Sequence, residues 1–399
     1  MNATTTIEIS TSLAAIPVTA WNALAGGNPF LRHEFLHALH DTGCACTATG
    51  WTPHYLLLRE NGALAGALAG AMPLYLKTHS YGEYVFDWAW ADAYQRHGLD
   101  YYPKLLNAVP FTPVGGSRLL AATDEHRRLL LAAALAEARD SDVSSLHILL
   151  PPPAEAEAMA AAGMMLRQGV QFHWNNAGYT DFEEFLASLN QVKRKKIRQE
   201  RRRVVEAGII FEWVEGNAIS EDLWAFFHRC YCTTYRLHHS TPYLNLDFFL
   251  RIGHLMAENI IMIVAHRDGS PIAASLNLHN GHTLYGRYWG GLEYHPALHF
   301  EACYYQVIEF CIARGIQIFE GGAQGEHKMA RGLLPVATQS AHWLAHPQFA
   351  AAVEDFLARE GQNIAAHMNE LAERNPYRNA EEGGPSDDVP TTSTQDNAR

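Results

Sequence analysis

The densest group of residues that can do chemistry is the polar loop at 324–331, QGEHKMAR, which Glu320 precedes. His327 carries the side chain that titrates near neutral pH, so it is a candidate general base or acid. Lys328 and Arg331 are cations that can offset negative charge developing on a carbonyl oxygen. The group therefore indicates acyl transfer to an amine. The alternative is an ordered polar loop with one salt bridge, and we favour function because Gly-rich loops at strand ends are frequent sites.

Three predicted strands precede this loop and must position it. Residues 260–266 and 271–278 are apolar runs separated by Asp268-Gly269, a strong hairpin signal. Asn280-Gly281 then turns the chain into a third run at 282–289. The pattern predicts a three-stranded meander that leads towards the loop.

A helix and a short strand complete the arrangement. Residues 299–315 have apolar positions at helical spacing and end at Gly315, where a helix C-cap belongs. Residues 316–320 predict a strand directly before the loop. Glu301 and Tyr304 lie three residues apart on the predicted helix, so we expect both to face the same cleft as the loop.

The order strand–strand–strand–helix–strand is the core pattern of GNAT acyltransferases, and several motifs narrow the resemblance. Over nearly its whole length the chain resembles the bacterial FemAB-like N-acyltransferases. The motifs that carry this resemblance are GRYWG (286–290), LHFEACYYQ (298–306), FEGGAQGEHKMARG (319–332), HSYGEYVFDWAWADAY (79–94), YYPKLLNAVPFTPVGGSRLL (101–120), KRKKIRQERRRV (193–204) and PYLNLDFF (242–249).

The resemblance implies an α+β fold of two tandem GNAT-like domains, each a mixed, mainly antiparallel sheet flanked by helices. An apolar hairpin around Asn61-Gly62 repeats the one near residue 268, as a duplication requires. We therefore expect an N-terminal domain at 1–175 and a C-terminal acyltransferase domain at 176–374, packed tightly with a cleft between them. Residues 375–399 are expected to form a disordered tail because their composition cannot bury a core.

The resemblance also implies an activity. The family resembles the Fem aminoacyltransferases, which extend peptidoglycan cross-bridges with aminoacyl-tRNA as donor. We therefore expect an N-acyltransferase that moves an acyl or aminoacyl group from an activated donor to a small-molecule or peptide amine, with no bound cofactor. A lysine of Fem-like enzymes lies near the transferred acyl group, and Lys328 is the matching position.

The donor stays open between a tRNA ester and a CoA thioester. Acetyl-CoA enzymes of the superfamily carry a Q/R-x-x-G-x-G/A loop whose amides at a helix N-terminus hold the pyrophosphate. Here the corresponding segment, which begins at Gly290-Gly291, lacks that pattern. An acyl-CoA-dependent transferase therefore remains the alternative within the enzyme class.

A basic segment at 193–203 has eight cations and one Glu in an otherwise acidic chain. Such runs are usually solvated helix faces, but this density favours a polyanion such as tRNA or the CoA phosphates. The candidate donor-binding residues are Lys193, Arg194, Arg198, Arg201 and Arg202. A catalytically idle protein that grips a polyanion through this segment is the alternative from another class.

The aromatic stretch at 79–94 is too polar for ordinary core, so it either lines an acceptor cleft or forms an interface with the second domain. The candidate substrate-binding residues here and elsewhere are His79, Tyr81, Glu83, Asp87, Trp88, Tyr243, Arg287, Tyr288, Trp289 and Gln324.

His33-Glu34-Phe35-Leu36-His37 matches the H-E-x-x-H zinc motif literally. With 22 histidines in the chain and no downstream ligand pattern, we interpret the match as coincidental and expect no metal.

Composition sets the remaining limits. The net charge of −12 argues against general nucleic-acid coating, and there is neither a signal peptide nor an apolar run long enough to span a membrane. Six cysteines without a C-x-x-C pair indicate reduced thiols. These features predict a cytoplasmic protein; they do not determine its oligomeric state.

Overall fold

The second half of the chain contains the predicted meander. In the computed structural model, which describes residues 5–60, 67–323 and 325–378, four antiparallel strands follow one another in the sheet, and the last pairs in parallel with a fifth. They are β10 (Ile209–Glu215), β11 (Ile260–Arg267), β12 (Ser270–His279), β13 (Thr283–Gly291) and β14 (Ile318–Glu320). The crossover from β13 to β14 is helical, as a parallel connection requires. It consists of α10 (Leu298–Phe300), a π-helical turn (Glu301–Tyr305) and α11 (Gln306–Arg314).

The first half repeats this order. β1 (Thr5–Ser10), β3 (Tyr55–Glu60) and β4 (Ala67–Met72) are antiparallel neighbours, and β4 continues into β5 (Leu74–Lys77), which pairs with β6 (Lys104–Asn107). Helix α4 (Asp124–Asp140) then leads to β8 (Ser145–Leu149), which is parallel to β6. The predicted tandem GNAT-like fold of mixed, mainly antiparallel sheets is therefore confirmed. The Asn61-Gly62 turn lies outside the described residues.

We had expected one sheet in each domain, but the strands do not divide in this way. Eleven strands from both halves form one continuous sheet in the order β10-β11-β12-β13-β14-β9-β15-β8-β6-β5-β2, and a second sheet contains β1-β3-β4-β7. Pro73 separates β4 from β5, and it lacks the N–H that a continuous ladder would need. The first-half strands therefore divide between two sheets at this residue.

Two long strands join the halves. β9 (Met165–Asn175) pairs with β14 at its C-terminal end and with β15 (Leu334–Leu344) along most of its length, and β15 also pairs with β8. Eleven residues of strand extend about 36 Å, which is enough to reach both halves. A strand from the predicted C-terminal domain therefore lies within the first-half sheet, and the boundary at residue 175 stays a prediction.

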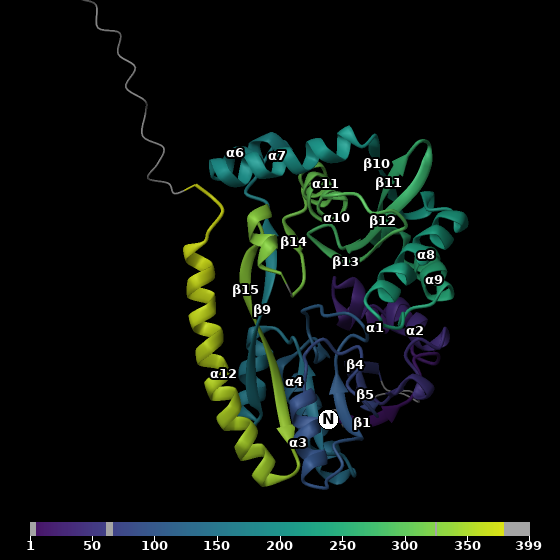
Figure 1. Ribbon diagram of the computed structural model, residues 1–399. Helices are drawn as coiled ribbons and strands as arrows, with labels where there is room; N and C mark the ends of the chain where they lie inside the picture. The colour runs from purple at the N-terminus through teal and green to yellow at the C-terminus, as the bar shows by residue number, and fades with distance from the viewer. Residues whose placement is uncertain (1–4, 61–66, 324, 379–399) are drawn as a thin grey trace, which may run out of the picture.

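Helices cover this sheet on both sides (Figure 1). Helix α12 (Pro347–Glu373), yellow in Figure 1, runs along β9 and β15 and continues through Gly361 without a break. Helices α8 (Glu221–Leu237) and α9 (Leu246–Leu255) pack together beside β12 and β13. The remaining elements are α1 (Val18–Ala25), α2 (His33–Asp41), β2 (Trp51–Pro53), α3 (Trp88–Arg96), β7 (Leu120–Ala121), α5 (Pro153–Ala161), α6 (Phe182–Ser188) and α7 (Gln191–Glu206).

One apolar core extends across both halves. Phe35 of α2 packs edge to face on Phe248 of α9, with ring centroids 5.4 Å apart. Phe30 packs in the same way on Tyr285 of β13 at 5.3 Å. All four side chains belong to one cluster of buried residues. The two halves therefore pack tightly against each other, as we expected.

The structure describes four residues of the predicted tail, 375–378. Tyr377 forms a bridge with Leu189 and donates a hydrogen bond from its hydroxyl to the Gly332 carbonyl, 2.7 Å away. Pro376 is buried. Residues 375–378 therefore pack on the fold. The Tyr377 side chain contacts the core, which the polar composition of the segment as a whole did not indicate. Residues 379–399 lie outside the described part.

Candidate active site

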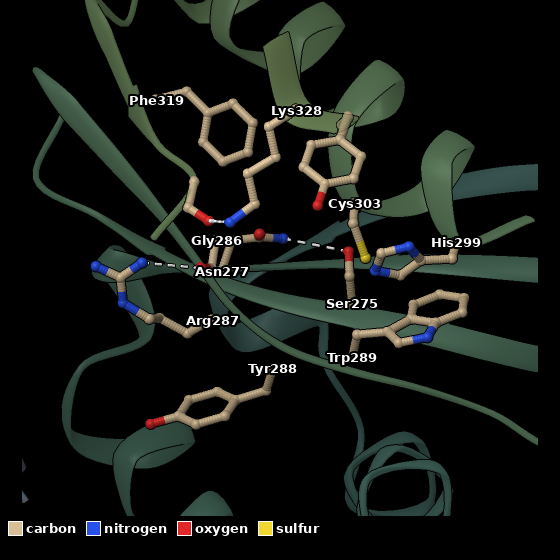
Figure 2. A pocket seen from close by; sticks show the side chains of 12 residues that line it. Ser275, Asn277, Gly286, Arg287, Tyr288, Trp289, His299, Cys303, Phe319 and Lys328 are labelled. Atoms are coloured by element: carbon tan, nitrogen blue, oxygen red, sulfur yellow. Dashed lines mark hydrogen bonds between the residues drawn. The ribbon is translucent and has the colours of Figure 1, made fainter. Parts of the chain in front are cut away.

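A cavity of about 130 Å³ lies where β13 and β14 part. The two strands pair in parallel only from Thr283 to Tyr285 of β13. After this, β13 continues to Gly291, whereas the segment that follows β14 turns away at Gly321. Beyond Tyr285, backbone groups of β13 on the side of β14 therefore have no strand partner. The described lining residues are Ser275, Asn277, Gly286, Arg287, Tyr288, Trp289, His299, Cys303, Tyr304, Phe319, Gly321 and Lys328 (Figure 2).

The π-helical turn determines which residues of the crossover face this cavity. The amide of Gln306 bonds to the carbonyl of Glu301, five residues back, which widens the turn. Residues five apart then share a face, so His299 and Tyr304 both line the cavity. Glu301, three residues before Tyr304, points away, and the expectation that these two face the same cleft was wrong for this reason.

Glu301 instead contacts the basic helix. Its carboxylate accepts hydrogen bonds from Arg201 Nε at 3.1 Å and from Gln306 Nε2 at 2.8 Å. Burial raises the pKa of Glu301. Through these hydrogen bonds Glu301 connects α7 with the crossover, and it is not among the residues that line the cavity.

Lys328 lies in the cavity wall without a carboxylate partner among the described residues. Its ammonium donates to the carbonyls of Gly321 at 2.7 Å, Gly322 at 3.2 Å and Ala323 at 3.2 Å. Burial, with a smaller contribution from Arg287, lowers the pKa of Lys328 to about 8. A buried cation without a counter-ion attracts negative charge, as its predicted role at the oxyanion requires.

Arg287 and Glu320 form a buried ion pair beside the cavity. Arg287 Nη2 and Glu320 Oε1 are 2.8 Å apart, and both side chains are almost fully covered. Arg287 also donates to the carbonyl of Gly286 at 2.9 Å. Glu320 therefore holds a lining arginine in place and is not among the residues that line the cavity itself.

Arg331 and His327, both predicted catalytic residues, do not line the cavity. The guanidinium of Arg331 is buried and lies 3.4 Å from the centre of the Phe300 ring. His327 is exposed, and its Nε2 lies 3.3 Å from the hydroxyl of Tyr304. Burial, followed by the positive charge of Arg331, lowers the pKa of His327. His327 can therefore act on a ligand in the cavity only through Tyr304. Gln324 lies outside the described residues.

A second hollow of about 380 Å³ opens next to the cavity and shares Arg287, Tyr288 and Trp289 with it. Its walls are largely aromatic, with Tyr84 from the first half and Tyr231, Tyr235 and Tyr243 from the second. Gly290 brings β13 close to α8, since a Cβ there would lie 2.1 Å from the Cys230 carbonyl oxygen. The predicted substrate residues Tyr243, Arg287, Tyr288 and Trp289 are thus brought together.

The stretch at 79–94 contributes to this hollow only through Tyr84, which the sequence did not single out. Tyr84 has a positive φ of 62°, which its packing in the hollow holds in place. Glu83 and Asp87 are buried elsewhere, and Lys104 Nζ lies 2.8 Å from Glu83 Oε2 and also contacts Asp87. These two carboxylates therefore stabilise the first half and do not face the hollow.

His79, Tyr81 and Trp88 also lie apart from the described linings of both hollows. His79 Nε2 is 3.0 Å from the Thr49 carbonyl, and Tyr81 and Trp88 pack edge to face at 4.9 Å. Their assignment to substrate binding was based on aromatic density, which here reflects packing among neighbours.

The basic helix α7 uses part of its charge internally. Arg201 bonds to Glu301 and Glu309, and exposed Arg198 pairs with Glu183. A hollow of about 540 Å³ lies at its N-terminal end, lined by Asn190, Gln191, Arg194, Lys195, Arg198 and Arg378. Among the residues that the structure describes, no acidic group pairs with Arg194, Lys195 or Arg378, so this hollow is strongly positive. Lys193 and Arg202 lie outside its lining.

A third hollow of about 650 Å³ follows the turn after β13 and shares Trp289 and His299 with the cavity. Its described lining contains no lysine or arginine, and Glu293 there pairs with His295 at 2.8 Å. Ala297, in a left-handed conformation, precedes the helical crossover, which begins at Leu298 and runs through the π-helical turn to Arg314. A helix N-terminus is therefore present here, but the described lining lacks the lysine or arginine that would pair with a pyrophosphate.

The H-E-x-x-H residues are committed to packing. His33 Nε2 lies 2.9 Å from the Leu13 carbonyl, and Glu34 pairs with Arg32. Within the described ranges there is no cluster of three potential metal ligands, no helix long and apolar enough to cross a membrane, and no cysteine in a disulfide.

A family model described as peptidoglycan biosynthesis/recognition, FemAB-like, matches residues 12–379. The chain belongs to the FemAB-like family. It is an acyltransferase with the GNAT-type fold that the resemblance implied. A search of curated proteins found no significant match.

Solved structures share the fold of this FemAB-like chain at low identity. FemX is 11% identical, with 85% of this chain and 98% of that chain covered at a TM-score of 0.52. L-PGS from Bacillus licheniformis is 10% identical, with 88% and 99% covered at 0.54. A conserved protein of unknown function from Bacteroides thetaiotaomicron is 9% identical, with 85% and 100% covered at 0.51.

The prediction from the sequence did not include four polar residues of the cavity, namely Ser275, Asn277, His299 and Cys303. Ser275 and Asn277 are two apart on β12 and so face the same side. His299 and Cys303 stand inside the LHFEACYYQ motif that carried the family resemblance. Alternation along the strand and the four-residue helical spacing were the available signals.

Proposed function

We propose that this acyltransferase moves an aminoacyl group from aminoacyl-tRNA to an amine of a peptidoglycan precursor. The observation that carries the proposal is the cavity where β13 and β14 part, with the Lys328 ammonium, which has no carboxylate partner among the described residues, in its wall. Attack of an amine on an ester places negative charge on the carbonyl oxygen. Lys328 is the cation that offsets this charge.

The distribution of positive charge supports a tRNA donor over CoA. The groove after β13, where this fold class holds a CoA pyrophosphate, contains Glu293 and no described cation in its lining. Three cations without an acidic partner among the described residues, Arg194, Lys195 and Arg378, instead line the N-terminal hollow of α7. A nucleic acid whose acceptor end enters the cavity can place its backbone phosphates there.

The tyrosine-lined hollow supports an amine acceptor. Aromatic faces attract an ammonium group and the hydroxyls can hydrogen-bond to it, while Trp289 and Arg287 connect this hollow with the cavity. The family description, peptidoglycan biosynthesis/recognition, is the basis for proposing a peptidoglycan peptide as the molecule that carries the amine.

The test compares two donors with one acceptor, a peptidoglycan peptide with a free side-chain amine. Wild type is incubated with bulk tRNA charged with ¹⁴C-labelled amino acids, or with ¹⁴C-labelled acetyl-CoA, and product is followed by mass spectrometry. Transfer from tRNA that is lost in Lys328→Ala supports the proposal. Transfer from acetyl-CoA alone would favour the CoA-dependent alternative, and tRNA binding without transfer from either donor would favour the binding protein.

A further inference from the structure

His299 occupies the junction between the cavity and the groove after β13. Its side chain lines both, and Trp289 beside it, with ring centroids 5.4 Å apart, also lines the tyrosine hollow. In Figure 2 the His299 ring enters the cavity from a different wall than Lys328. A group here lies in the cavity where the proposed transfer takes place, next to the tryptophan that connects it with the tyrosine-lined hollow.

His299 is also the one imidazole among the described residues that line the cavity. The other described lining groups that ionise there are Arg287, Tyr288, Cys303, Tyr304 and Lys328. Burial raises the pKa of Tyr288, Cys303 and Tyr304, so these remain protonated and cannot take up a proton near neutral pH. Arg287 forms an ion pair with Glu320, and the Lys328 ammonium donates hydrogen bonds to three carbonyl oxygens.

The protonation state of His299 suits a proton acceptor. Burial lowers its pKa to about 4, and the positive charges of His327, Arg331 and Lys328 act in the same direction. No described hydrogen bond occupies either ring nitrogen, so a lone pair is free at neutral pH. The amine proton becomes acidic once the nitrogen bonds to the carbonyl carbon, so the neutral ring can accept it, and the resulting imidazolium is acidic enough to protonate the leaving oxygen.

We propose that His299 is a catalytic proton shuttle, which takes the proton of the attacking amine and delivers it to the leaving group. The amine nitrogen forms a bond to the carbonyl carbon, and its proton passes to the ring of His299. The bond from that carbon to the donor oxygen then breaks, and the same proton moves from His299 to the departing oxygen. The amide and the free hydroxyl result, with His299 again neutral.

This inference rests on the proposed function, and it replaces His327 as the expected base. His327 contacts Tyr304 and is not among the residues that line the cavity, whereas the side chain of His299 lines the cavity itself. The two assignments differ in their response to added imidazole, because only loss of His299 leaves a space inside the cavity.

The experiment measures transfer from charged tRNA in wild type, His299→Gln, His299→Ala and His327→Gln. His266→Gln is the matched control, since His266 pairs with Glu212 near the exposed end of β11. We expect kcat of both His299 variants to fall about 100-fold with KM little changed, a typical loss for a proton-transfer group. Added imidazole should restore His299→Ala in proportion to its neutral fraction and should not restore Lys328→Ala.

Wild-type turnover in folded His299→Gln would overturn the inference. Imidazole that fails to restore folded His299→Ala would also overturn it, as would a loss of turnover confined to His327→Gln. If His299→Ala does not fold, the test uses His299→Gln alone. The inference then requires that kcat of wild type shows a solvent isotope effect and that kcat of His299→Gln does not. Wild type that transfers nothing from tRNA instead contradicts the proposed function.

Discussion

Arg331 and Glu200 form a buried ion pair that fastens the loop after β14 to the basic helix α7. Arg331 Nη2 donates to both carboxylate oxygens of Glu200, at 3.0 and 2.9 Å. Tyr305 donates its hydroxyl to the same carboxylate. The one acidic residue in the predicted cationic segment thus holds the position of the loop that carries Lys328.

Removing one partner of this pair should destabilise the fold more than it affects chemistry. We expect Arg331→Met to lower the free energy of unfolding by about 3–5 kcal/mol, because the Glu200 carboxylate would be left buried and unpaired. Urea denaturation measures the change. Arg198→Ala, which removes the exposed pair with Glu183, should cost at most about 1 kcal/mol. Equal losses in the two variants would contradict the structural role of Arg331.

Loss of the Lys328 ammonium should slow transfer. Lys328→Ala is expected to cost about 3 kcal/mol in the activation barrier, roughly a hundredfold in kcat. It also removes the hydrogen bonds to the Gly321, Gly322 and Ala323 carbonyls, so its melting temperature should fall as well, and the rate is compared on protein shown to be folded. Initial rates with charged tRNA measure the loss in kcat. Rates near those of wild type in a folded variant would place oxyanion stabilisation elsewhere in the cavity.

The same residue predicts the alkaline side of the pH profile. The pKa of Lys328 is lowered to about 8, so its charge, and with it transfer, should be present below pH 8 and be lost as the pH rises through that value. Lys328→Arg keeps its charge at higher pH and should move the alkaline limb upwards or remove it. An unchanged limb in Lys328→Arg would show that another group titrates.

The N-terminal hollow of α7 should carry the salt-dependent part of tRNA binding. We expect the triple variant Arg194→Gln, Lys195→Gln, Arg378→Gln to weaken tRNA binding and to reduce the slope of log K against log salt by about 2–3, since each phosphate contact contributes about 0.7–0.9. Fluorescence titration at several salt concentrations measures both quantities.

The control for that variant is Arg128→Gln with Arg139→Gln, two exposed arginines of α4 in the first half. If both variants change the slope equally, the affinity reflects net charge alone. Arg201 is unsuitable for this test because it holds Glu301 and Glu309, so its loss would disturb the crossover.

Buried Lys77 should make stability depend on pH. Burial lowers its pKa from 10.5 to about 7, and the fold therefore binds this proton less tightly than the unfolded chain does. The cost is constant below pH 7 and declines as the pH rises from 7 towards 10.5. Lys77→Met removes the charge and keeps the chain length, so it should be more stable than wild type at pH 6.5.

The advantage of Lys77→Met over wild type should shrink by pH 9.5. Urea denaturation at the two pH values measures it. An advantage that is the same at both pH values would mean that Lys77 is neutral or fully charged throughout. The variant also loses the contact of the ammonium with the Trp51 ring, 3.7 Å from its centre, and this loss matters mainly at pH 6.5, where Lys77 is charged.

Local patterns in the sequence determined the elements and the family. The Asp268-Gly269 and Asn280-Gly281 turns, strand alternation and helical spacing all act between near neighbours, so the meander and the crossover were predictable from them. The motifs around Trp289, His299 and Lys328 determined the family for the same reason: they are short and contiguous.

Tertiary structure alone decided which of those residues share the cavity. The π-helical turn separated Glu301 from Tyr304, and the long strands β9 and β15 joined the two halves into one sheet. We had expected Arg331 to act in catalysis and Arg201 to bind the donor. In the structure they pair with Glu200 and Glu301, which are distant from them in sequence. Charge and spacing indicate that a side chain can bind an anion, but whether it binds a substrate or a buried carboxylate depends on contacts that form only when the chain folds.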